Sequence, residues 1–145
     1  MAENAKSSPL AVTLCWAQGL YFLATGAWPL LSVETFQRVT GQKSDHLIAD
    51  PPTEADHWML NTISALIIVI SVVILTAAWR RRISFDVSLL GIMSAAALAI
   101  IDVVYVARGT IWPIYLADSA VEVVIIAAWT WLLANGGHRR RHLSE

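Results

Sequence analysis

The chain has 145 residues and a formal net charge of −1, and 57% of its residues are hydrophobic whereas only 14% are charged. A soluble domain carries charge on about a quarter of its residues, so this composition excludes an ordinary soluble domain. The near-neutral charge argues against a nucleic-acid-binding surface, and the single cysteine, Cys15, excludes an internal disulfide.

Four apolar segments follow one another along the chain, and each has the ~20 residues that an α-helix needs to cross a bilayer. Their apolar residues are continuous rather than alternating, which favours helices over barrel strands. The N-terminus lacks the basic start of a signal peptide, so we expect the first helix to be retained. The sequence therefore predicts an all-α polytopic membrane protein, a four-helix bundle formed by residues 1–145 as a single transmembrane domain. The predicted helices are 10–31, 58–79, 87–107 and 113–134, with an external loop at 32–57.

The distribution of arginines predicts the orientation. Arginine triplets at 80–82 and 139–141 follow the second and fourth segments, whereas the loop 32–57 is mainly acidic. Cytoplasmic loops of membrane proteins are enriched in Lys and Arg, so both termini and the 80–86 loop are expected in the cytoplasm. The 32–57 loop and the 108–112 turn then lie outside a plasma or inner membrane. The triplets also suit contact with anionic membrane lipids.

Polar and aromatic side chains recur on one face of the first helix, which Pro29 interrupts near its outer end. This stripe fits either ordinary interhelical hydrogen bonding or one wall of a ligand site. It consists of Gln18, Tyr21, Thr25 and Trp28. In the following loop, SVETFQRVTG predicts a short helix on the membrane surface, with Val33, Phe36 and Val39 on one side. His46 and His57 lie among carboxylates there without the spacing of a metal site.

The second and third helices carry polar and small-residue stripes. Asn61, Ser64 and Ser71 share one face of the second helix. On the third helix, small residues form a predicted packing seam, because they let a neighbouring helix approach closely. This seam of Gly91, Ala95 and Ala99 leads to Asp102, which is therefore expected to point into the bundle. On the fourth helix, Tyr115, Asp118, Glu122, Ile125 and Trp129 share one face, ahead of a glycine pair that predicts the end of that helix.

The three carboxylates Asp102, Asp118 and Glu122 are the strongest functional signal, because an acid at the bilayer centre costs ~2.5–3.5 kcal/mol and usually marks a site. From the helix rise, Asp102 and Asp118 lie roughly 7–8 Å below the outer interface and Glu122 ~14 Å below it. Arg108 is the nearby base, and it can pair with Asp102 or Asp118 but not with all three. Glu122, the deepest, is therefore our candidate for holding a proton at neutral pH.

These groups predict an acidic cavity that opens outward, whose tyrosines and tryptophan suit an organic cation. The opposite interpretation is a closed network of Asp, Tyr and Arg side chains that only fixes the helix register. No histidine lies at membrane depth and no glycine-rich phosphate loop is present, so neither haem nor a nucleotide cofactor is predicted. The predicted ligand-binding residues are Asp102, Asp118, Glu122, Tyr105, Tyr115, Tyr21, Trp112, Gln18 and Asn61, with Arg108 as the charge partner; no catalytic or metal-binding residue is assigned.

Residues 21–29 and 105–113 share the pattern Tyr, six residues, Trp-Pro. Both segments run from inside to outside under the predicted orientation. The pair fits two parallel two-helix halves, as in some transporters, with Tyr21 and Tyr105 opposite each other across the cavity. Chance recurrence of an interfacial Trp-Pro pair is the alternative.

The segment QGLYFLATGAWPLL resembles the first helix of DoxX-like four-helix membrane proteins, which carry a Gly-aliphatic-aromatic pattern and an alanine-glycine pair. The four-helix plan with buried acids is also similar to the EXPERA group of sterol isomerases and amine-binding proteins. That group places its acids on the first and second helices, where this chain has Gln18 and Asn61. Small multidrug transporters share the size but depend on a first-helix glutamate that this chain lacks.

Three functional hypotheses follow. The leading one is an outward-facing acidic pocket in the membrane that binds or moves a small lipophilic or cationic ligand, with coupling to protons. The second is a non-catalytic accessory subunit, docked through its small-residue seam to a larger membrane complex. The third is an isomerase-like membrane enzyme. A homodimer is left open, because four helices bury little surface.

Overall fold

A computed structural model describes residues 8–40 and 54–141, and these residues form helices joined by short turns. The helices are α1 (Pro9–Leu31), α2 (Val33–Thr40), α3 (Glu54–Trp79), α4 (Phe85–Ala107) and α5 (Tyr115–Arg141). Within the described residues, four helices contain segments long and apolar enough to cross a membrane: Pro9–Leu31, His57–Trp79, Phe85–Ala107 and Tyr115–Asn135. The prediction of a four-helix transmembrane bundle is confirmed, and the predicted helices agree with these spans to within two residues at each end.

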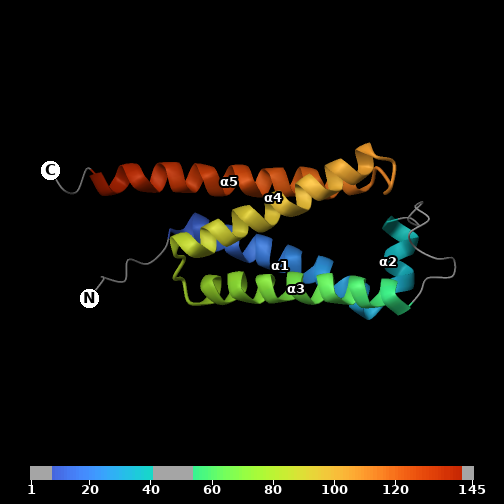
Figure 1. Cartoon of the computed structure of the whole chain (residues 1–145). Helices are drawn as coiled ribbons and strands as arrows, with labels where there is room; N and C mark the ends of the chain where they lie inside the picture. Colours follow the sequence, from blue (N-terminus) through green and yellow to red (C-terminus); the bar gives the residue numbers. More distant parts are fainter. Residues whose placement is uncertain (1–7, 41–53, 142–145) are drawn as a thin grey trace.

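The bundle consists of two helical hairpins (Figure 1). α1 packs along α3, and α4 packs along α5, whereas contacts between the two pairs are fewer. The start of α1, the end of α5 and the α3–α4 turn lie at one end of the bundle, which we call the terminal end. The short helix α2 lies across the opposite end, which we call the α2 end (Figure 1).

Local sequence explains where the helices begin and end. Ser8 caps α1 by accepting a hydrogen bond from the amide of Ala11 at 3.2 Å, and Ser84 caps α4 by accepting one from the amide of Val87 at 3.3 Å. α1 continues past Pro29, which is buried, and ends at Leu31. The predicted end of the last helix at its glycine pair is wrong: α5 continues to Arg141. Glycine lowers helix propensity by about 1 kcal/mol, but a helix stops there only when the backbone turns into the left-handed region.

The two hairpins are joined by a buried hydrogen-bonded contact that centres on Gln18 of α1. Its Nε2 donates to the Gly91 carbonyl of α4 at 2.8 Å, and its Oε1 accepts from the Trp129 indole of α5 at 2.8 Å. Gln18 is 0% exposed and Trp129 is 1% exposed. Polar side chains of this kind hold transmembrane helices together. The predicted seam of Gly91, Ala95 and Ala99 is buried here, inside the chain.

We expect Gly91→Ala to destabilise the bundle by about 1–3 kcal/mol, although alanine is the better helix former. A Cβ at position 91 would lie 2.8 Å from Gln18 Oε1 and 2.9 Å from Trp129 Nε1. Both atoms are fixed by their mutual hydrogen bond, so relief of the clash would break it. Thermal unfolding in detergent micelles measures the loss. Ala97→Val, an added volume on an exposed face of the same helix, should leave the melting temperature nearly unchanged; equal effects of the two substitutions would contradict this account.

Candidate binding cavity

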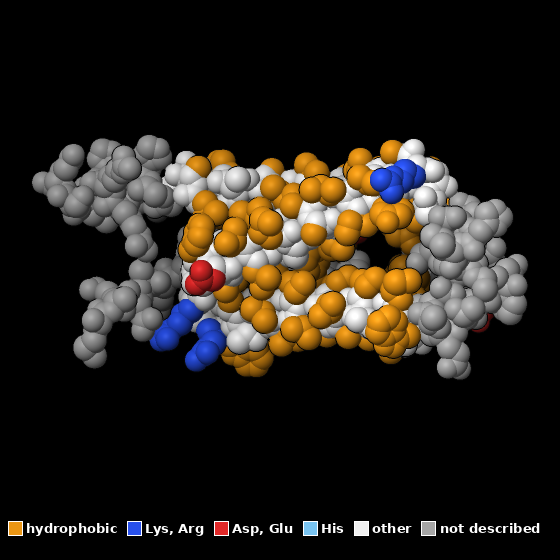
Figure 2. All heavy atoms as spheres, in the orientation of Figure 1, with side chains coloured by type: hydrophobic (Ala, Val, Ile, Leu, Met, Phe, Trp, Pro, Cys, Tyr) orange, Lys and Arg blue, Asp and Glu red, His pale blue; other side chains and the backbone are white. Residues whose placement is uncertain are grey.

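A cavity of about 300 Å³ lies between the two hairpins near the α2 end. Residues from α1, α2, α3, α4 and α5 line it, so it forms only when both hairpins are in place. The space-filling view shows a hollow between the two halves at this end, surrounded mainly by hydrophobic side chains (Figure 2). Its volume is at the lower end of the range for small-molecule sites.

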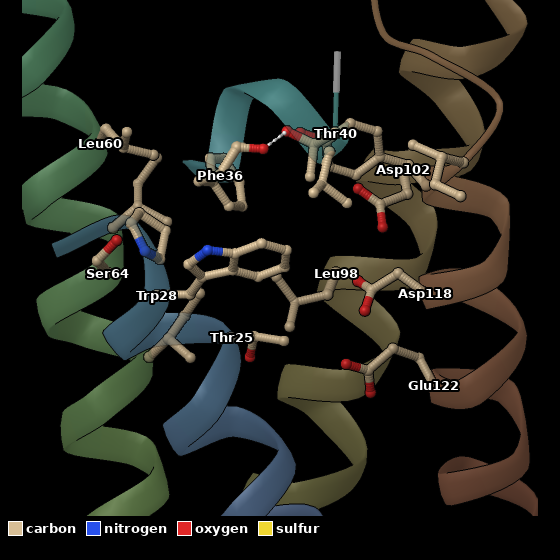
Figure 3. A pocket seen from close by; sticks show the side chains of 16 residues that line it. Thr25, Trp28, Phe36, Thr40, Leu60, Ser64, Leu98, Asp102, Asp118 and Glu122 are labelled. Carbon is tan, nitrogen blue, oxygen red and sulfur yellow. Dashed lines mark hydrogen bonds between the residues drawn. The ribbon is translucent and has the colours of Figure 1, made fainter. Parts of the chain in front are cut away.

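One wall of the cavity is acidic. Asp102 of α4 and Asp118 and Glu122 of α5 line the cavity, and Figure 3 shows their carboxyl groups one above another, pointing into it. Asp118 and Glu122 share a helix face because they are four residues apart. Asp102 follows the small-residue seam of α4, which turns its side chain toward α5 and the cavity. The three acids that the sequence predicts to converge are therefore brought together.

The opposite wall is apolar and aromatic. The Trp28 side chain of α1 extends across the cavity toward the α4 and α5 side (Figure 3). Its ring makes an edge-on contact with Phe36 of α2, with ring centroids 5.7 Å apart, and its Nε1 donates to Thr35 Oγ1 at 3.1 Å. Leu60, Ile63 and Ile67 of α3 complete this wall. The site is thus amphipathic, with acids facing hydrocarbon and an indole ring.

The acids are short of hydrogen-bond partners. Asp118 accepts a hydrogen bond from the Tyr21 hydroxyl of α1. In contrast, Asp102 Oδ2 and both oxygens of Glu122 are buried and have no hydrogen-bond partner in the structure. Glu122 is 0% exposed. Buried polar atoms are almost always paired, so three unpaired carboxylate oxygens in one cavity require an explanation.

The predicted charge partner does not supply these hydrogen bonds. The Arg108 guanidinium lies over the Tyr105 ring, 5.7 Å from its centroid, and within the described residues no salt bridge joins it to an acid. The prediction that Arg108 pairs with Asp102 or Asp118 is therefore wrong in this structure. Arg108 and Tyr105 are both exposed and follow Asp102 by six and three residues. Stacking on an aromatic face lets the arginine remain at the helix end without entering the cavity.

Five of the predicted ligand-binding residues do not line the cavity. Tyr105 and Asn61 are each three residues from a cavity-lining residue, Asp102 or Ser64, which rotates them roughly 60° around their helices and exposes them. Trp112 is 52% exposed in the α4–α5 turn. Gln18 lies deeper, in the contact that joins the hairpins. Tyr21 touches the site through Asp118, so it faces α5 rather than Tyr105, and the predicted Tyr21–Tyr105 pair is not formed.

The apolar wall and the position of α2 beside the cavity are not predicted from the sequence. The amphipathic pattern of α2 is the available signal, but the same pattern also fits a helix that lies on the membrane surface. In the structure, Phe36, Val39 and Thr40 of α2 line the cavity. Leu60, Ile63, Ile67 and Leu98 had no distinguishing signal, because apolar residues occur all around helices in a membrane. Tyr115, by contrast, lines the cavity as predicted.

Comparison of the chain with protein-family models, curated proteins and solved structures gives no match. Within residues 8–36, 38–40 and 57–135, no three His, Cys, Asp or Glu side chains are grouped so that they could hold a metal ion. The fold and the site thus define a multi-pass, four-helix membrane protein with an amphipathic acidic cavity.

Proposed function

We propose that this protein binds a small lipophilic amine as its ammonium ion. The ammonium group lies against the acidic wall at Glu122, and the apolar body lies against Trp28 and the side chains of α3. Under the orientation predicted from the arginine triplets, the terminal end lies in the cytoplasm and the cavity faces the outer leaflet. The observation that carries the proposal is the set of buried carboxylate oxygens without hydrogen-bond partners.

Charge balance explains why a cation suits the cavity. A buried carboxylate without a partner is too costly to persist, so Glu122 needs either a proton or a cation. Within the described part of the chain, no arginine or lysine reaches the cavity. An ammonium group brings both the positive charge and the N–H donors that Asp102 Oδ2 and the Glu122 oxygens lack.

The opposite wall supports the organic part of such a ligand. An indole face attracts a nearby cation, and the apolar side chains of α3 cover a hydrocarbon body. Leu60, Ile63 and Ile67 lie within the span His57–Trp79, so hydrocarbon side chains at membrane depth face the acidic wall. A hydrated inorganic cation would gain little from this apolar wall, whereas an amphipathic amine contacts both the acidic wall and the apolar wall.

Protons and ligand are coupled in this scheme. The titratable groups that face Glu122 are Asp118 and Tyr115 of α5, Asp102 of α4 and Tyr21 of α1; the lining residues of α2 and α3 carry none. Binding of the ammonium ion therefore replaces a proton held within this carboxyl group cluster. Ligand binding and proton release are then linked equilibria.

We expect 4-phenylbutylamine to bind about 10- to 100-fold more tightly than 4-phenylbutanol at pH 7.5, because charged hydrogen bonds contribute ~1.5–3 kcal/mol. The two compounds have nearly the same size and the same apolar body. Calorimetric titration of the protein in lipid nanodiscs measures both affinities, and empty nanodiscs correct for partitioning. Equal affinities would contradict an ammonium site.

The structure offers no comparable support for an accessory subunit. The small-residue seam that was expected to dock a partner is buried against the chain's own α1 and α5. The closed Asp–Tyr–Arg network also lacks its arginine, because Arg108 stacks on Tyr105. The amine site is therefore the function that the geometry favours.

A further inference from the structure

We infer that the ligand enters the cavity sideways from the bilayer, through the gap between α3 and α4, as an uncharged amine that is protonated at the site. The inference rests on the proposed amine site and adds to it an entry route and a class of ligand. The class is an amphiphile that dissolves in the hydrocarbon of the membrane.

The course of the helices creates this gap. α3 and α4 are joined by a short turn at the terminal end, and α4 then slopes away from α3 toward the α2 end (Figure 1). The hollow in Figure 2 lies between these two helices where they have diverged. Ile63 of α3 both lines the cavity and is 49% exposed, so it forms part of the rim. Leu98 of α4 lines the cavity and is partly exposed as well.

The rim is at membrane depth. Ile63 and Leu98 lie within the spans His57–Trp79 and Phe85–Ala107. Their side chains are hydrocarbon, which matches lipid tails and offers nothing to a hydrated ion. The opening therefore faces the hydrocarbon layer and selects molecules that are already dissolved in it.

The route from water is covered by α2. Phe36, Val39 and Thr40 lie over the α2 end of the cavity, and the Trp28 ring is fixed to α2 by the Phe36 contact and by its hydrogen bond to Thr35. A ligand arriving from the water side would have to displace this helix. A ligand arriving from the lipid passes only the hydrocarbon side chains of Ile63 and Leu98 at this rim.

Charge then determines the form that enters. Transfer of an ammonium ion from water into hydrocarbon has a large unfavourable free energy, whereas transfer of the neutral amine does not. At the site, the amine nitrogen lone pair takes the proton from a protonated Glu122: the O–H bond breaks, an N–H bond forms, and an ammonium–carboxylate pair results. The transfer needs no further reactant and leaves the cavity electrically balanced.

Two matched substitutions distinguish the routes, because both place an indole in the cavity lining. Ile63→Trp narrows the lateral opening, and Thr40→Trp adds the same bulk on the α2 side. We expect Ile63→Trp to slow the association of 4-phenylbutylamine by about tenfold or more, with a much smaller change in Kd, and Thr40→Trp to slow the association much less than Ile63→Trp does. Surface plasmon resonance on captured nanodiscs measures both rates.

Slower association in Thr40→Trp with no change in Ile63→Trp would overturn the lateral route while leaving the amine site intact. A weaker Kd with an unchanged association rate in Ile63→Trp would also overturn it, because that result shows only a filled cavity. Absence of amine binding by the unaltered chain would instead refute the proposed function. Should Ile63→Trp fail to fold, Leu98→Trp provides the same obstruction from α4.

The uncharged form is tested separately with N,N,N-trimethyl-4-phenylbutylammonium, which cannot lose its charge. At pH 8 a larger fraction of 4-phenylbutylamine is neutral than at lower pH. The association of the trimethylammonium compound should be slower at this pH by about tenfold or more. Equal association rates would contradict entry as the neutral amine.

Discussion

Binding of 4-phenylbutylamine should strengthen by up to about tenfold per pH unit between pH 5 and pH 8, and the Glu122→Gln variant should lose most of this slope. At these pH values the free amine is an ammonium ion. Its binding therefore releases the proton that neutralises the Glu122 carboxylate in the ligand-free protein. A fall in pH therefore favours the protonated, ligand-free state. Glutamine keeps the size of the side chain but can neither take up nor release that proton. Calorimetric titrations at several pH values measure the slope.

The control for this experiment is Asp86→Asn. Asp86 is an exposed acid in the first turn of α4, at the terminal end of the bundle. Its replacement removes one carboxylate from the same chain without touching the cavity, so the slope should remain. A Glu122→Gln variant that retains the full slope would assign the proton to Asp102 or Asp118. Loss of the slope in Asp86→Asn would show that surface charge causes it.

Glu122→Leu should stabilise the ligand-free protein by about 1–3 kcal/mol and abolish amine binding. The Glu122 residue is 0% exposed and its carboxyl oxygens form no hydrogen bond. Its burial therefore costs free energy that no contact in the ligand-free protein offsets. A leucine of similar volume removes this cost. Gain of stability with loss of function is the behaviour expected of a residue kept for its ligand.

Thermal unfolding in detergent without ligand measures the stability change, and Val124→Leu is the control. Val124 is 67% exposed on the same helix, so leucine there should have little effect. A Glu122→Leu variant that unfolds at a lower temperature would mean that the carboxyl group makes a structural contact. That result would support the alternative in which a closed network of side chains only fixes the helix register.

The four helices and the faces of α4 and α5 could be predicted from sequence because both follow from local periodicity. Twenty apolar residues specify a spanning helix, and a spacing of four puts Asp118 and Glu122 on one side of it. The small-residue seam then fixes which way Asp102 faces. These three facts place the acidic wall without any knowledge of the other helices.

The remaining features depend on how helices far apart in the sequence meet. Arg108 is close to Asp102 along the chain, but the Tyr105 ring offers it a position at the helix end, so proximity in sequence does not produce an ion pair. Asn61 and Ser64 are three residues apart and therefore differ by roughly 60° around the helix, which decides between exposure and burial only once α3 has packed on α1. The role of α2 follows from the divergence of the two hairpins, which no local pattern encodes.

Pro29 has a consequence for the apolar wall. Proline has no amide hydrogen, so the main-chain carbonyl of Thr25, four residues earlier, loses its usual helical donor. Thr25 and Pro29 both line the cavity. The interruption in the main-chain hydrogen bonds of α1 therefore falls at the level of the cavity, in the helix that carries Trp28 of the wall opposite the acids.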